Sequence, residues 1–170
     1  MPTVSSLKNN DENTLSAQEA SQRFLKLLEK IRSTDELTPK LIEDTMGTKG
    51  VSRLNKPNDY DFIGHLNNNS WVYHIVLFID PSSDDERKKL YFEFIPTTKK
   101  DSSPQTISAG CFVTLESYHK QFLANGFRYL GDSQYRGTSR QYSRDNLNIL
   151  VQYKIQNNVE HECVTRIDVR

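Results

Sequence analysis

Apolar and polar residues alternate in one segment near the C-terminal end of the chain. The apolar positions, separated by polar residues except at Leu150, are Leu147, Ile149, Val151, Tyr153 and Ile155. Because successive side chains of a β-strand point to opposite faces, this pattern predicts a strand with one face in a core and one in solvent. Such strands are typical of antiparallel sheets that are covered on one side only. We therefore expect an antiparallel sheet with an open face.

Further strands are predicted where β-branched and aromatic residues lie between turn residues. With the alternating segment at 147–156, they are expected at 71–79, 90–95, 134–143 and 161–169. Residues 48–69 show no periodicity and contain Gly50, Pro57 and Gly64, so we expect an irregular connection there, which could include a short edge strand near 60–63. The predicted sheet thus has about five strands.

Capping residues and helical spacing of apolar side chains predict two to three helices. Ser16 and Glu19 have the spacing of a capping box, and Pro39 follows the N-cap residue Thr38 at the first helical position. The expected helices cover about 16–33, 38–47 and 114–126. Since 170 residues fit one domain, the sequence predicts a single α+β domain with its helices on one face of the sheet.

The order of these elements divides the domain into two similar parts. The parts, 16–96 and 111–170, each contain a Thr-capped helix that ends at a Gly and is followed by antiparallel strands. Although the residues themselves differ, this order is compatible with a degenerate helix-plus-meander repeat. Residues 1–15 are polar and rich in Asn and Ser, and we expect them to form a disordered tail.

Charge and hydropathy limit the classes of partner. The 22 Lys and Arg residues balance the 22 Asp and Glu residues, so the chain has no overall attraction to nucleic acid or anionic lipid. No apolar run reaches the roughly 18 residues that a membrane helix needs. The N-terminus lacks the pattern of a signal peptide. It has the polarity of a lipoprotein tether but not the lipidated Cys, which leaves open that a leader has been removed.

The chain has two cysteines, Cys111 and Cys163. They could form one disulfide in an oxidising compartment or be two buried free thiols in a cytosolic protein. Loop-closure entropy predicts that such a bridge would stabilise the fold by about 4 kcal/mol. His161 shares a predicted strand face with Cys163, which makes zinc a less favoured third alternative. We expect the disulfide, no metal and a periplasmic location, with the cytoplasm as the alternative.

The sequence carries no motif of a known catalytic centre. None of the four histidines has the spacing of a zinc enzyme, and Gly-x-Ser-x-Gly is absent. Gly110 and Cys111 precede a predicted helix, where a thiolate would be stabilised, so a Cys–His enzyme is a minor alternative. His74 interrupts an apolar strand, and we expect it to be hydrogen-bonded at the edge of the core. We therefore expect a non-enzyme without a cofactor.

Two segments contain residue types that suit a binding site. One is the acidic turn after residue 80, and the other is the Arg- and Tyr-rich segment 127–144. The candidate partner-binding residues are Asp84, Asp85, Glu86, Tyr135, Arg136, Arg140 and Tyr142. The turn could equally be solvated, and the strand could be a polar face in solvent. Arg and Tyr also suit single-stranded nucleic acid, so segment 127–144 supports that alternative.

Two segments resemble the Thr-helix-Gly units of small bacterial envelope domains. They are LTPKLIEDTMG at 37–47 and CFVTLESYHKQFLANGF at 111–127. The chain resembles the beta-lactamase-inhibitor-protein-like fold and its outer-membrane lipoprotein relatives over about 16–170, and it is similar in layout to some immunity proteins. The resemblance implies short helices on an antiparallel sheet, but it assigns no functional residue.

We therefore expect a non-enzymatic immunity or inhibitor protein of the bacterial envelope. Its partner would be a secreted bacterial toxin or effector whose active site it occludes. The first alternative is a module that binds RNA or single-stranded nucleic acid through residues 127–144. The second is a structural envelope lipoprotein.

Overall fold

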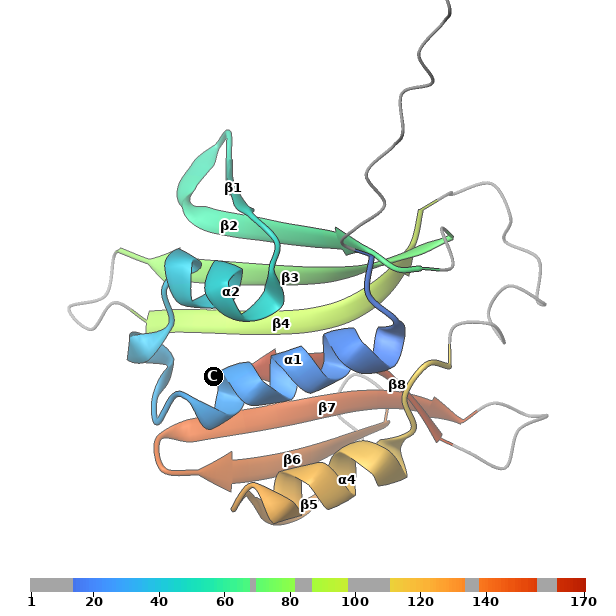
Figure 1. The fold of residues 1–170 in the computed structure, drawn as a ribbon. Coiled ribbons are helices and arrows are strands. Elements are labelled where there is room, and N and C mark those ends of the chain that lie inside the picture. Colours follow the sequence, from blue (N-terminus) through green and yellow to red (C-terminus); the bar gives the residue numbers. More distant parts are fainter. Residues whose placement is uncertain (1–13, 68–69, 82–86, 98–110, 134–137, 156–161) are drawn as a thin grey trace, which may run out of the picture.

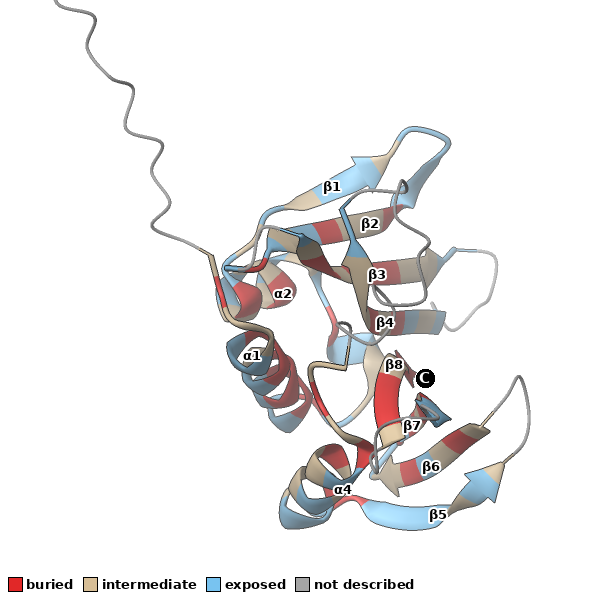
Figure 2. Ribbon diagram, turned by 90° about the vertical axis from the view of Figure 1, so that its right-hand side faces the viewer, coloured by how far each residue is buried: buried red, intermediate tan, exposed pale blue. Residues whose placement is uncertain are grey.

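Eight antiparallel strands form one sheet, and the α-helices lie on one of its two faces (Figures 1 and 2). The structure is a computed structural model, and it describes residues 14–67, 70–81, 87–97, 111–133, 138–155 and 162–170. The helices are α1 (Ala17–Glu29), α2 (Pro39–Met46) and α4 (Leu115–Ala124), with a 3-10 turn η1 (Thr34–Glu36) before α2. The α+β class with helices on one face is confirmed.

Two four-stranded meanders make up the sheet. The first contains β1 (Gly50–Arg53), β2 (Lys56–His65), β3 (Trp71–Asp80) and β4 (Arg87–Pro96). The second contains β5 (Arg128–Ser133), β6 (Thr138–Arg144), β7 (Leu147–Ile155) and β8 (Glu162–Val169). The spatial order is β1-β2-β3-β4-β8-β7-β6-β5, so the last strands of the two meanders pair at the centre. This is the order that a two-fold rotation of one helix-plus-meander unit would produce.

The expected number of about five strands is too small. β1 and β2 lie within residues 48–69, which were expected to be largely irregular, and β5 lies in a segment where no strand was expected. Gly50 and Gly64 both lie in strands. A Cβ on Gly50 would overlap the ring of Phe62, and one on Gly64 would overlap the ring of Tyr73. A glycine inside a strand can mark such a close approach rather than a loop.

The predicted helix ends are confirmed. Ser16 and Glu19 form the capping box of α1, and the Thr38 and Thr114 side chains cap α2 and α4. Gly47 ends α2 in the left-handed conformation, with φ of 76°. These caps satisfy backbone N–H groups that the first helical turn leaves without partners.

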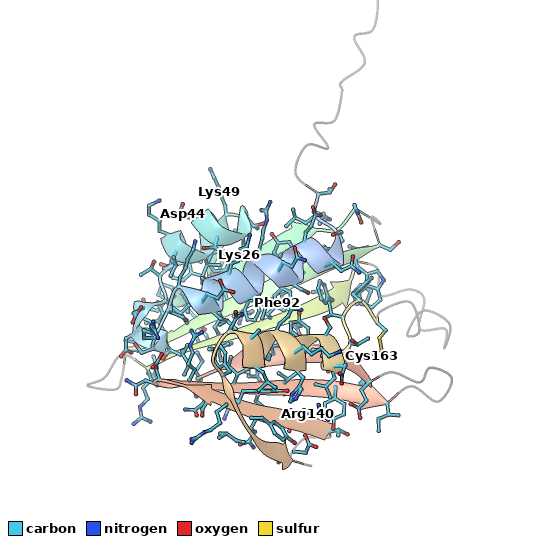
Figure 3. All side chains as sticks on the ribbon, turned by 60° about the horizontal axis from the view of Figure 1, so that its bottom comes forward. Lys26, Asp44, Lys49, Phe92, Arg140 and Cys163 are labelled. Carbon is cyan, nitrogen blue, oxygen red and sulfur yellow. A yellow bond between two sulfur atoms is a disulfide. The ribbon has the colours of Figure 1, made fainter. Side chains whose placement is uncertain are left out.

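The core fills the space between the helices and the covered face of the sheet. The rings of Phe24 on α1 and Phe92 on β4 stack there with centroids 4.5 Å apart, and Figure 3 shows Phe92 between the helices and the sheet. Leu15 is 9% exposed and forms a β-bridge with Leu66. Leu15 therefore belongs to the packed domain rather than to the tail expected for 1–15, while residues 1–13 lie outside the described residues.

A disulfide joins the segment before α4 to β8. Cys111 and Cys163 have a Sγ–Sγ distance of 1.95 Å and a Cα–Cα distance of 5.2 Å. The bridge spans 52 positions of the sequence and fixes the entry to α4 against the sheet. The expected pairing is confirmed, and a bridged pair fits an oxidising compartment.

Candidate functional site

The face of the sheet opposite the helices, called the open face below, carries the alternate residues of each strand. On β3 and β4 the side chains of Ile75 and Phe92 are buried in the core, so their neighbours His74 and Glu93 point to the open face. No described helix covers this face (Figure 2). The open face therefore presents side chains that the strands themselves hold in position on the side away from the helices.

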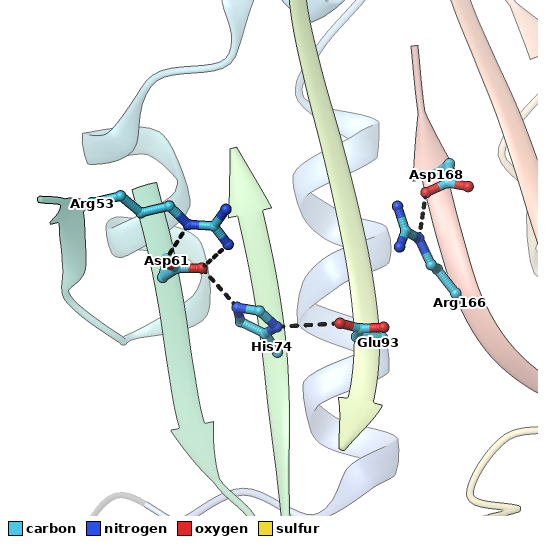
Figure 4. Close-up of polar contacts among 6 residues, drawn as sticks. All are labelled: Arg53, Asp61, His74, Glu93, Arg166 and Asp168. Atoms are coloured by element: carbon cyan, nitrogen blue, oxygen red, sulfur yellow. Dashed lines mark hydrogen bonds and ion pairs between the residues drawn. The ribbon is translucent and has the colours of Figure 1, made fainter. Parts of the chain in front are cut away.

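A row of six charged side chains crosses the open face from β1 to β8 (Figure 4). The row, called the charged row below, consists of Arg53, Asp61, His74, Glu93, Arg166 and Asp168. Cations and anions alternate along it when His74 is protonated. In the strand register Glu93 lies directly opposite Arg166, so the row continues across the central β4–β8 pair. The row thus connects both meanders.

The first pair of the row, Arg53 and Asp61, is a bidentate ion pair. The Nε and Nη2 atoms of Arg53 donate to the two carboxylate oxygens of Asp61 at 2.7 and 2.8 Å. This interaction lowers the pKa of Asp61 and, with a smaller contribution from hydrogen bonding to Tyr91, raises the pKa of Arg53. Bidentate Arg–carboxylate pairs fix the orientation of both groups. The outer edge of the first meander is therefore held rigidly.

His74 is bonded through both ring nitrogens. Nδ1 lies 3.2 Å from Oε1 of Glu93, and Nε2 lies 2.8 Å from Oδ1 of Asp61. The bond to Glu93 is the main cause that raises the pKa of His74, the bond to Asp61 adds to it, and burial opposes both. The ring therefore keeps its positive charge at a higher pH than a histidine in solvent. His74 joins β2, β3 and β4 across the open face.

Aromatic rings support the two arginines of the row. The Arg166 guanidinium lies over the Tyr91 ring, with Cζ 3.7 Å from the centroid, and Arg53 lies over Phe78 at 5.6 Å. The Phe78 and Tyr91 rings contact each other with centroids 5.3 Å apart. Arg166 also donates to Asp168 at 2.6 Å. Cation–π contact and an ion pair together restrict each guanidinium to one orientation.

Two hollows of about 360 Å³ each lie toward opposite ends of the strand order. One is lined by residues of β2 and β3, including Pro57, Asp59 and Phe78. The other is lined by residues of β5, β6 and β7, including Leu130 and Leu150. The charged row is thus flanked by depressions that could each receive a side chain of a bound molecule.

Of the seven residues that the sequence suggested as partner-binding, the structure describes Arg140 and Tyr142. Asp84, Asp85, Glu86, Tyr135 and Arg136 lie outside the described residues. Tyr142 is fully buried under α4, where its hydroxyl lies 2.9 Å from Nδ1 of His119. Its side chain therefore belongs to the core and not to a surface, which corrects that assignment.

Arg140 lies on β6, and its Nε donates to Asp132 on β5 at 2.9 Å. It shares its strand face with Tyr142 and is 22% exposed. In the strand register it lies opposite the core residue Val151 of β7, so it is on the side of the sheet opposite the charged row. Its role in partner binding stays a prediction.

Sequence reasoning missed the charged row. His74 was expected to be hydrogen-bonded, and this is confirmed, but its partners depend on which strands are neighbours. Arg53 and Asp61 lie in the segment where mainly irregular structure was expected. One sequence signal could have indicated the charged row. Charged residues alternate with core residues in some strands, as Arg166 and Asp168 do around the buried Ile167.

The part of the chain that the structure describes contains no group of three or more His, Cys, Asp or Glu side chains that could hold a metal ion. Among the described helices, none is long and apolar enough to cross a membrane. Comparisons with protein-family models, curated proteins and solved structures found no match to this chain.

Proposed function

We propose that this protein is a non-enzymatic immunity or inhibitor protein that binds a secreted bacterial toxin through the open face of its sheet and occludes the toxin's active site. The observation that carries the proposal is the charged row, whose arginines are held in place by ion pairs and aromatic rings. Arg and Tyr are the residue types that contribute most to protein interfaces. A surface fixed before binding loses little conformational entropy on binding.

The contacts of His74 support a binding role over a catalytic one. A general base needs a ring nitrogen that can accept a proton from a substrate. Both ring nitrogens of His74 are directed at the carboxylates of Asp61 and Glu93. With its pKa raised by these bonds, the ring acts as a charged cross-link between strands.

The disulfide supports the proposed compartment. Stable disulfides are typical of proteins outside the reducing cytosol, so the Cys111–Cys163 bridge fits the periplasm of a bacterium. A toxin delivered to or through that compartment would meet the inhibitor there. None of the helices in the described residues covers the open face, as an occluding surface requires (Figure 2).

The test is site-specific photocrosslinking in native cells. A photoreactive amino acid replaces Lys89, which is exposed on the open face opposite Phe78. The matched control replaces Lys26, which is exposed on α1 on the other side of the molecule (Figure 3). We expect one discrete crosslinked protein from position 89 and none from position 26, and we expect the purified protein to inhibit the captured partner. Crosslinking only from position 26 would contradict the proposal.

A further inference from the structure

We infer that the open face recognises a carboxylate-bearing segment of its protein partner through the guanidinium groups of Arg53 and Arg166, which lie around Tyr91. This inference rests on the proposed function and names the chemistry of the partner. It concerns side chains that no sequence motif singled out. It follows from the greater exposure of the two arginines compared with the carboxylates that they bind.

The two arginines retain donor capacity after their internal contacts are counted. Arg166 uses Nε for its bond to Asp168, and within the described residues no acceptor is bonded to its Nη atoms. Arg53 uses Nε and Nη2 for Asp61. Because a guanidinium has five N–H donors in a planar fork, each arginine can still donate to an incoming carboxylate.

The two arginines of the charged row are more exposed than the carboxylates with which they pair, whereas His74 is less exposed than Glu93. The Arg53 side chain is 33% exposed and that of its partner Asp61 is 24% exposed. The difference is larger in the second pair, where Arg166 is 34% exposed and Asp168 is 10% exposed. A molecule that approaches the open face therefore meets guanidinium groups first, although the charges of the row balance.

Tyr91 brings the two arginines to one place. Arg166 lies on its ring, and Arg53 lies over the ring of Phe78, which contacts the Tyr91 ring with centroids 5.3 Å apart. Lys89, two positions before Tyr91 on β4, is exposed on the same face. The outward charge at this point of the sheet is thus positive, which is complementary to carboxylates.

A short acidic polypeptide segment fits this surface better than a nucleic acid does. Asp61, Glu93 and Asp168 lie next to the arginines, and they would repel a continuous chain of phosphates. One or two carboxylates can bond to the guanidinium forks without approaching those anions. The formal net charge of zero also gives no long-range attraction to a polyanion.

The test measures binding of short peptides by NMR of the arginine Nε–Hε groups. The probe is the capped peptide Asp-Glu-Tyr-Glu, and its control is the same peptide with Asn and Gln in place of the acids. We expect the acidic peptide to shift the Arg53 and Arg166 signals in a saturable way and the amide peptide to leave them unchanged. R53K and R166K should each weaken binding about tenfold, because Lys cannot form a fork. The Lys154→Ala variant, an exposed charge elsewhere on the same face, should bind within about twofold of the wild type.

Two results would overturn the inference. One is the absence of arginine shifts at millimolar acidic peptide while the protein remains folded by its thermal melt. The other is tighter binding of a thymidine oligonucleotide than of the peptide, which would indicate a nucleic-acid partner. The photocrosslinking result is independent, since a crosslink at position 89 without peptide binding would mean that the open face binds a protein by different chemistry.

Discussion

The buried hydroxyl groups of Tyr118 and Ser21 are joined by a hydrogen bond of 2.8 Å, which Tyr118 donates. Tyr118 lies on α4 and Ser21 on α1, so the bond connects the helices that precede the two meanders. Burial raises the pKa of Tyr118 above its ordinary value, and the hydroxyl therefore stays protonated throughout the neutral range. This polar contact fixes how the two helices are placed on the covered face.

The Tyr118→Phe variant should be less stable by about 1 kcal/mol, because it leaves the Ser21 hydroxyl buried without its donor. The measurement is the free energy of unfolding from urea titrations. The Ser21→Ala variant is the matched partner, and the double variant should cost less than the sum of the two single changes. Strict additivity would show that the bond does not contribute.

Arg144 connects the C-terminal ends of the same two helices. Its guanidinium donates to the carbonyl oxygens of Leu28 in the last turn of α1 and Ile31 just after it, and to that of Asn125 at the end of α4. It also lies over the Phe127 ring at 4.3 Å. Because the last carbonyls of a helix lack internal partners and carry partial negative charge, a cation at this place is strongly stabilising.

We expect Arg144→Met to lower the free energy of unfolding by about 2–4 kcal/mol, since three part-buried carbonyls lose their donor. Arg144→Lys should recover only part of this loss, because one ammonium group cannot reach both helix ends. The control is Arg32→Ala, which removes an arginine that is 72% exposed and should change stability by less than about 1 kcal/mol. Equal effects of the changes at 144 and 32 would contradict this role.

The helices and the second meander were largely predictable because their signals are local. Ser16, Thr38 and Thr114 act within one helical turn, and the alternation at 147–155 depends on one strand alone. β2 was not predicted, because its Gly64 is explained only by the Tyr73 ring on the neighbouring strand. Such a contact depends on strand pairing, which no single segment encodes.

The charged row was less predictable for the same reason. The two carboxylate partners of His74 follow from the strand register. His74 lies opposite Glu93 on β4 and opposite Ile63 on β2, two positions from Asp61. The opposite error concerns Tyr142, which looks like an interface residue by type. Its burial follows from the position of α4, which covers that face of β6.

Removal of the disulfide should lower stability by about 4 kcal/mol, the value expected from loop-closure entropy for a bridge between Cys111 and Cys163. The measurement compares urea titrations of the oxidised protein with and without a reductant. A double Cys→Ser variant should match the reduced protein and should no longer respond to reductant. Unchanged stability of the reduced protein would show that α4 is held to β8 by packing alone.

His74 should make the stability of the fold depend on pH in a defined direction. Hydrogen bonds to Glu93 and then Asp61 raise the pKa of His74 in the folded state above the ordinary value of about 6.5. The folded state thus binds this proton more tightly than the unfolded state does. The resulting stabilisation is fully present below the unfolded pKa and is lost as the pH rises through the raised, folded-state pKa.

We therefore expect the difference in unfolding free energy between the wild type and His74→Gln to be largest near about pH 6 and to shrink toward pH 9. The measurement is urea unfolding across this range, and Glu93→Gln, which removes the main cause of the raised pKa, should flatten the pH dependence. A difference that grows with pH would mean that His74 is neutral when it stabilises the sheet.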